Sequence, residues 1–157
     1  MPTTPQAFTE CLTTIEQLLP PDSLATLLPP ASETSIQQIE QLLGAPLPMG
    51  LRQLLFWHDG QEWNAELRES DNRRLLAASE IMDALKFFLD PEEEFCEPWE
   101  RYWVPFLTND SGDYVVVDAS PSGTGELIHY WHDWDDRSVA YQSLNEWAEG
   151  LKEELSQ

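Results

Sequence analysis

Residues 32–60, SETSIQQIEQLLGAPLPMGLRQLLFWHDG, contain the pattern that decides the fold. Ser32 is a good helix N-cap, apolar residues at helical spacing follow it, and Gly44 suits the left-handed exit from a helix. Leu47-Pro48 then forms a rigid connector, because proline fixes φ and restricts the residue before it. The next apolar segment, 49–57, is a short helix closed by an Asp-Gly turn. This stretch therefore predicts two helices joined at a proline corner.

Outward from this pair, the pattern predicts further helices at both ends of the chain. Upstream, 6–19 places apolar residues at helical spacing, and Pro20-Pro21 ends that helix. Downstream, Ser143 and Glu146 form a capping box at the start of an amphipathic C-terminal helix. The central part predicts a helix at 80–89 capped by Ser79, and strands at 74–77, 103–107, 114–118, 126–131 and 138–141. The order of helices, antiparallel hairpins and helix is typical of an α+β fold.

The length and the charge of the chain restrict its class. A chain of 157 residues fits a single domain. Its net charge is −21, and it is uneven: residues 1–79 carry ten acids and four bases, whereas residues 80–157 carry nineteen acids and four bases. Such a field repels nucleic-acid phosphates and anionic membranes, and it attracts a basic partner. The alternative is that the acidity serves solubility alone.

The location expected from the sequence is the cytoplasm. The N-terminal segment has neither the basic residue nor the apolar run of a signal peptide. No stretch approaches the roughly 18–20 apolar residues of a membrane helix. Cys11 and Cys96 allow one disulfide at most, which is not the cysteine framework of a small secreted domain.

The sequence contains no recognised catalytic or metal-binding pattern. Neither cysteine has the setting of a reactive thiolate, and no nucleophile elbow or phosphate-binding loop occurs. His129 and His132 are three residues apart on a predicted strand, so their side chains point to opposite faces and spacing does not favour a shared metal with Asp133. We therefore expect no enzyme activity, no metal and no cofactor.

The seven tryptophans are the residues best suited to binding. Tryptophan is enriched at interaction hot spots, because it buries a large surface and keeps one polar donor. Trp103 and Trp147 have the periodicity of core residues. Trp134, which lies among aspartates, is the one we most expect to be exposed.

Several segments, in order, resemble the SUKH superfamily of Smi/Knr-type cell-wall regulators and bacterial toxin-immunity proteins. The helix ending at Leu43-Gly44, the Leu47-Pro48 pair and the Asp59-Gly60 turn are similar to its helix–LP–helix–nG signature. Trp103-Val104-Pro105-Phe106 resembles its central hairpin, and His132-Asp133 resembles its "hd" loop. The family commonly has asparagine where Asp59 stands here.

The resemblance implies a bent antiparallel sheet flanked by N-terminal helices and a C-terminal helix. It implies one domain over residues 1–157, with a core at about 30–155 and the helix 6–19 packed on it. It also implies a non-enzymatic immunity protein that neutralises a toxin, often a nuclease. A regulatory or scaffold module without a toxin partner, and a hydrolase with an acidic site, remain as alternatives.

Nuclease toxins are commonly basic, and an acidic protein suits such a surface. The acidic run 90–100, which we interpret as a solvated loop, and the loop after His132 are the predicted contact patches. Their candidate contact residues are Asp90, Glu92, Glu93, Glu94, Glu97, Glu100, Asp133, Trp134, Asp135 and Asp136.

Overall fold

The computed structural model describes residues 4–68 and 70–157. Residues 1–3, at the start of the segment considered for a signal peptide, lie outside the described residues, as does Glu69. The described part contains six helices, which are α1 (Pro5–Leu18), α2 (Pro21–Leu24), α3 (Glu33–Leu43), α4 (Met49–Trp57), α5 (Ala78–Phe88) and α6 (Leu144–Leu155). None of these helices has both the length and the apolar character needed to cross a membrane.

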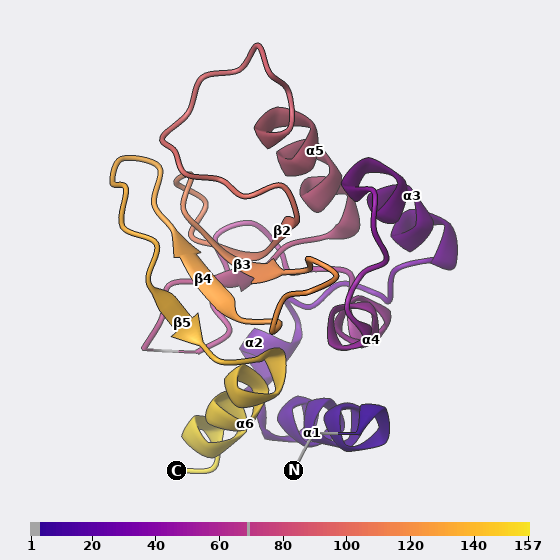
Figure 1. Ribbon diagram of the computed structural model, residues 1–157. Coiled ribbons are helices and arrows are strands. Elements are labelled where there is room, and N and C mark those ends of the chain that lie inside the picture. The colour runs from indigo at the N-terminus through magenta and orange to yellow at the C-terminus, as the bar shows by residue number, and fades with distance from the viewer. Residues whose placement is uncertain (1–3, 69) are drawn as a thin grey trace.

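The strands form one antiparallel sheet in the order β1-β2-β3-β4-β5. Its strands are β1 (Arg74–Leu75), β2 (Trp103–Thr108), β3 (Tyr114–Asp118), β4 (Leu127–Tyr130) and β5 (Val139–Tyr141). The register shifts between Pro105 and Leu107, and again between Leu127 and Ile128. Helices flank the sheet, with α1 and α6 side by side at the end where both termini lie (Figure 1). The predicted α+β class is therefore confirmed.

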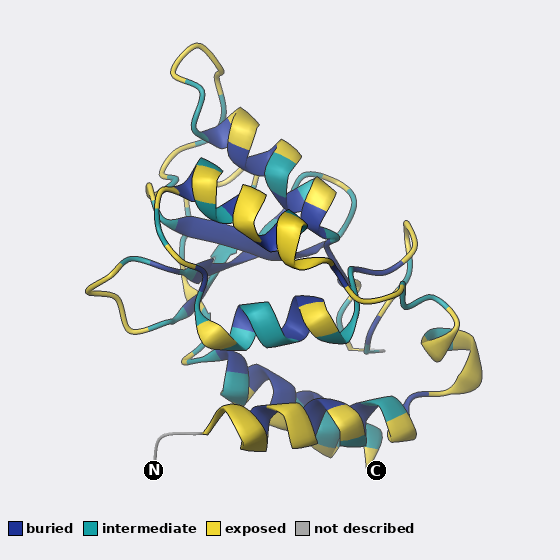
Figure 2. Cartoon of the chain, turned by 90° about the vertical axis from the view of Figure 1, so that its right-hand side faces the viewer, coloured by how far each residue is buried: buried dark blue, intermediate teal, exposed yellow. Residues whose placement is uncertain are grey.

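Local capping explains several of the helix ends. Ser32 accepts a hydrogen bond from the Ser35 amide at the start of α3, and Gly44 ends that helix with φ +79°. Ser143 accepts from the Glu146 amide at the start of α6. The five longer helices each bury one face and expose the other, as the alternating colours along the helices show (Figure 2), whereas the short α2 buries no residue.

The start of α5 differs from the prediction that Ser79 caps it. Ala77 is the N-cap residue, and the helix begins at Ala78, whose amide donates to Asp59 Oδ1 at 2.7 Å. Gly60 (φ +84°) lies so close to Ala77 that a Cβ at position 60 would be 2.5 Å from the Ala77 nitrogen. The Asp-Gly turn thus caps α5 from 19 residues away in the sequence, and a side-chain oxygen from asparagine would serve as well.

The two faces of the sheet bury different clusters. Val115 and Val117 belong to the main core, together with apolar residues of α1, α3, α4, α5 and α6. Val116 and Tyr130 belong to a smaller cluster with Ala84 and Phe88 of α5. This follows the two-residue period of a strand. Because Phe8, Leu12 and Ile15 of α1 lie in the main core, we propose that the chain is a single domain.

Candidate functional site: an acidic docking face

The acidic loop 90–100 covers part of the face of the sheet that buries the smaller cluster. Trp99 stacks on Phe88 with ring centroids 3.8 Å apart and an interplanar angle of 4°, and it meets Trp103 and Tyr130 edge to face. Phe95 also packs against Phe88. The predicted solvated loop thus has an exposed outer side, and its two aromatic residues, Phe95 and Trp99, are half-buried. The physical reason is that the apolar rings of Phe95 and Trp99 are stabilised when they leave water, whereas the carboxylates of the loop stay hydrated.

The carboxylates of this loop point to solvent. Asp90 is half-buried, and the other five acids of the run are exposed. In the second predicted patch, Asp133 and Asp135 are exposed and Asp136 is half-buried. None of these side chains forms an ion pair with any described residue. Their negative charge is thus available to a partner.

The tryptophans divide much as the sequence predicts. Trp103 and Trp147 are buried, and Trp134 is 58% exposed. Trp63 is more exposed still, at 74%. The sequence did not distinguish it, because the fold of the segment around residue 63 depends on contacts with distant parts of the chain, such as the bond from the Asn64 amide to Asp110.

Arg137 joins the two acidic segments, which the sequence presents as separate patches. Its guanidinium donates to the carbonyl oxygens of Pro98 and Cys96 in one segment, at 2.8 and 3.1 Å, and to those of Trp134 and Asp136 in the other, at 2.6 and 2.7 Å. It also lies 4.3 Å from the centroid of the Tyr130 ring. The loop after α5 and the β4–β5 loop accordingly lie on the same side of the molecule (Figure 1). Together, residues 90–100 and 133–136 form one surface, which we call the acidic face.

Most of the positive charge is used inside the molecule. Five of the six arginines hydrogen-bond or ion-pair with other parts of the chain. Arg73 and Arg74 are at most 5% exposed in their side chains. Since most of the arginines are paired within the molecule and the acids of the two loops are not, the acidic face keeps a strong negative charge.

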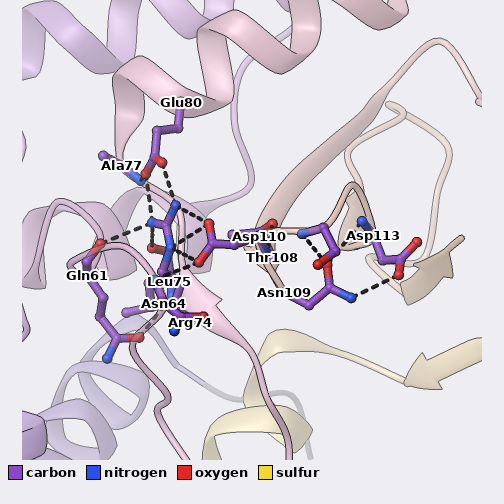
Figure 3. Close-up of polar contacts among 11 residues, drawn as sticks. Gln61, Asn64, Arg74, Leu75, Ala77, Glu80, Thr108, Asn109, Asp110 and Asp113 are labelled. Atoms are coloured by element: carbon purple, nitrogen blue, oxygen red, sulfur yellow. Dashed lines mark hydrogen bonds and ion pairs between the residues drawn. The ribbon is translucent and has the colours of Figure 1, made fainter. Parts of the chain in front are cut away.

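Arg74 is the centre of a buried polar network beside the acidic face (Figure 3). It forms bidentate pairs with Glu80 at 2.6 and 3.0 Å and with Asp110 at 2.7 and 2.8 Å, and it donates to the Gln61 carbonyl at 3.0 Å. The hydrogen bonds that the Arg74 guanidinium donates to Glu80, and then those to Asp110, raise its pKa more than burial lowers it. The network holds β1, the start of α5 and the β2–β3 turn together.

A second polar pair fastens the β2–β3 turn to the end of β4. Asp113 Oδ1 accepts from the His132 backbone amide at 2.8 Å and lies 2.7 Å from His132 Nδ1. The hydrogen bond with Asp113 raises the pKa of His132 above 6.5. Burial raises the pKa of Asp113, but the hydrogen bonds from His132 and Asn109 outweigh it and bring the pKa below 3.8.

This pair predicts a pH dependence of stability. The contribution of His132 is complete below pH 6.5 and is lost as the pH rises through its higher pKa in the folded protein. The contribution of Asp113 is complete above pH 3.8 and is lost as the pH falls through its lower folded pKa. We expect His132→Gln to reduce the fall in Tm between pH 6 and pH 8, measured by thermal unfolding. An unchanged fall in the variant would show that the pair contributes nothing.

Asp113 and His132, together with Asp133, form the only group within residues 4–68 and 70–157 whose potential ligand atoms lie close enough together to hold a metal ion. One ligand atom each of Asp113, His132 and Asp133 lies within 4.8 Å of the others. Asp113 Oδ1 already accepts from the amide and the ring of His132, so the geometry is that of a hydrogen-bonded clamp. His129, which the sequence places near His132, instead stacks on Trp131.

The described residues show no activated nucleophile. No serine, threonine or cysteine among them is hydrogen-bonded to a histidine: His58 contacts Glu16 and the Leu28 carbonyl, and His132 contacts Asp113. Burial, followed by the nearby charge of Glu149, raises the pKa of the Cys11 thiol to about 11. Both cysteines are free.

Comparisons with known proteins place the chain in a family. No curated protein matches it at a significant level. The sequence model of the SMI1 / KNR4 family (SUKH-1) matches residues 30–150, which is more than half of the chain. That range begins just before the helix pair of α3 and α4 and includes all five strands, the Asp59-Gly60 turn and both acidic loops. The chain therefore belongs to the SMI1 / KNR4 family (SUKH-1).

Proposed function

We propose that this protein is a non-enzymatic binding module of the cytoplasm that docks a basic protein through its acidic face, and that it is an immunity protein. In this role it neutralises a basic toxin, such as a nuclease, by occluding its active site or substrate groove. The observation that carries the proposal is the joining of two acidic, unpaired segments into one surface by Arg137. The family is consistent with the proposal, since its domains typically act in protein–protein interaction.

The charges of the acidic face favour such a partner. Nucleases bind phosphates and therefore commonly present a basic surface. Opposite charge on the two proteins speeds their encounter, from about 10⁵–10⁶ M⁻¹s⁻¹ toward as much as about 10⁸–10⁹ M⁻¹s⁻¹ at low salt. Trp134, exposed at the centre of the second segment, supplies an aromatic anchor of the kind found at binding hot spots.

The test uses the proteins encoded next to this chain's gene. Each is produced in a host cell with and without the chain, and the growth of the cells is followed. We expect one neighbour to arrest growth and the chain to restore it. Purified chain and neighbour are then combined in stopped flow at low and moderate salt, and we expect the association rate constant to fall steeply as salt is added.

The variant Glu92→Lys/Glu97→Lys/Asp135→Lys tests the surface. We expect its association rate constant to fall about tenfold or more, because charge complementarity steers the encounter. The control, Glu10→Lys/Asp22→Lys/Glu153→Lys, makes the same change in net charge on exposed residues of α1, α2 and α6. An equal effect of both variants would refute the acidic face as the docking surface. If no neighbouring protein is toxic or bound, the immunity role is wrong.

A further inference from the structure

A cavity of about 660 Å³ opens beside the acidic face. It lies between the C-terminal half of α5, the acidic loop, the β2–β3 turn and the end of β4. Its volume is in the range of sites that receive a side chain or a small ligand. Aromatic rings form much of its lining: these are Phe87, Phe88, Phe95, Tyr114 and Tyr130.

The cavity is also negatively charged. Four carboxylates line it, and two of them, Glu80 and Asp110, are held by Arg74. The other two, Asp83 and Glu94, have no ion-pair or hydrogen-bond partner among the described residues and are exposed at its mouth. The lining therefore has aromatic rings within and two unpaired acids at the entrance.

An anion does not fit this lining, although Arg74 and His132 lie within it, and His132 is already paired with Asp113. A guanidinium has five N–H donors. In Arg74 the Nε group donates to Asp110, Nη1 donates to Glu80 and to backbone carbonyls, and Nη2 donates to Glu80 and Asp110. No donor of Arg74 is left for a phosphate or carboxylate ligand, and the unpaired acids would repel one.

A cation fits both parts of the lining. Aromatic rings attract a cation over their faces, and carboxylates pair with it. Arginine suits this site better than lysine, because its planar guanidinium stacks on rings and binds carboxylates with two hydrogen bonds. The protein itself shows both contacts, with Arg137 over the Tyr130 ring and Arg74 paired bidentately with Asp110.

We propose that this cavity receives an arginine side chain that the basic partner presents, with the guanidinium between the Phe87 and Phe95 rings and the carboxylates of Asp83 and Glu94. This inference rests on the proposed function and extends it, since it names the residue that anchors the partner. The acidic face then attracts the partner, and the cavity sets which surface of the partner docks.

The test is a titration of the full ¹⁵N-labelled chain with three capped tripeptides, followed by NMR. The peptides are Ac-Gly-Arg-Gly-NH₂, its lysine counterpart, and its citrulline counterpart, which has the shape of arginine without the charge. We expect the arginine peptide to cause saturable shifts in the amides of Phe87, Phe95 and Ser111. We expect the lysine peptide to bind more weakly, and the citrulline peptide to cause no saturable shift. Equal shifts with citrulline, or shifts confined to other regions, would overturn the inference.

Two matched double variants separate the cavity from general electrostatics. We expect Asp83→Asn/Glu94→Gln to weaken arginine-peptide binding about fivefold to tenfold, the sum of two exposed ion pairs. The control, Asp22→Asn/Glu153→Gln, removes the same charge from exposed residues of α2 and α6, and we expect a change of less than about twofold. A similar loss in both variants would contradict the site.

The peptide titration needs no partner protein, so the two proposals fail separately. If the peptide does not bind but the partner docks on the acidic face, the cavity inference alone is wrong. If the peptide binds and no basic partner exists, the proposed function is wrong and the cavity remains an arginine site.

Discussion

Replacement of Arg74 by methionine is expected to lower the free energy of unfolding by about 3–5 kcal/mol, the cost of breaking a buried ion pair on one side only. The Arg74 side chain is 4% exposed, and Asp110 is 9% exposed. Methionine fills similar space but leaves the carboxylates of Glu80 and Asp110 without their cation. Denaturant unfolding followed by tryptophan fluorescence measures the loss.

Two further variants identify the cause of that loss. In Arg74→Met/Glu80→Gln/Asp110→Asn the uncompensated charges are gone, while oxygen acceptors remain for the Ala77 and Asn64 amides. We expect this variant to recover much of the lost stability. Arg52→Met removes an arginine whose side chain is 26% exposed from its ion pairs with Glu33 and Glu40 and should cost less than Arg74→Met, at about 1 kcal/mol. If Arg74→Met costs no more than Arg52→Met, the network does not stabilise the fold as described.

Replacement of Arg137 by methionine should separate the two halves of the acidic face. The guanidinium makes four hydrogen bonds to backbone carbonyls of both segments, and bonds from a charged donor contribute about 1.5–3 kcal/mol each in favourable sites. Because Arg137 is partly exposed, we expect a total loss of about 1.5–3 kcal/mol. We also expect faster amide hydrogen exchange in residues 96–99 and 134–137, measured by mass spectrometry.

The control for this change is Lys86→Met, which removes the same charge from an exposed residue of α5. It should leave both stability and exchange within experimental error of the parent protein. Faster exchange limited to one of the two loops in the Arg137 variant would mean that Arg137 orders that loop alone. Such a result would remove the observation on which the docking face rests.

Helices whose ends are capped by residues close by in the sequence could be predicted from the sequence. Ser32 and Gly44 delimit α3, and Ser143 starts α6, because caps act within three or four residues. The prediction for α5 chose Ser79, the local polar residue, whereas Asp59 supplies the oxygen from another segment. The predicted strand at 74–77 is shorter in the structure, where β1 comprises Arg74 and Leu75.

The candidate site likewise has some features that the sequence predicts and others that only tertiary contacts create. Composition identified the acidic segments, and the position of Trp134 among aspartates indicated its exposure. Arg137 and Arg74, which organise the site, carry no sequence signal, since each is one basic residue in a chain with few others. Likewise, nothing local reveals that Trp99 of the acidic run stacks on Phe88.

The sequence by itself determined the order of helices and strands, the family signature at residues 32–60, and the excess of negative charge in the second half of the chain. Only the tertiary structure decided which acids are paired, where the arginines lie, and that a cavity forms beside the acidic loop. The physical reason is distance along the chain. Caps and helical periodicity act within one or two turns, whereas Arg74 meets Asp110 across 36 residues and Arg137 meets Pro98 across 39. Such contacts exist only after the core has packed the sheet and the helices together.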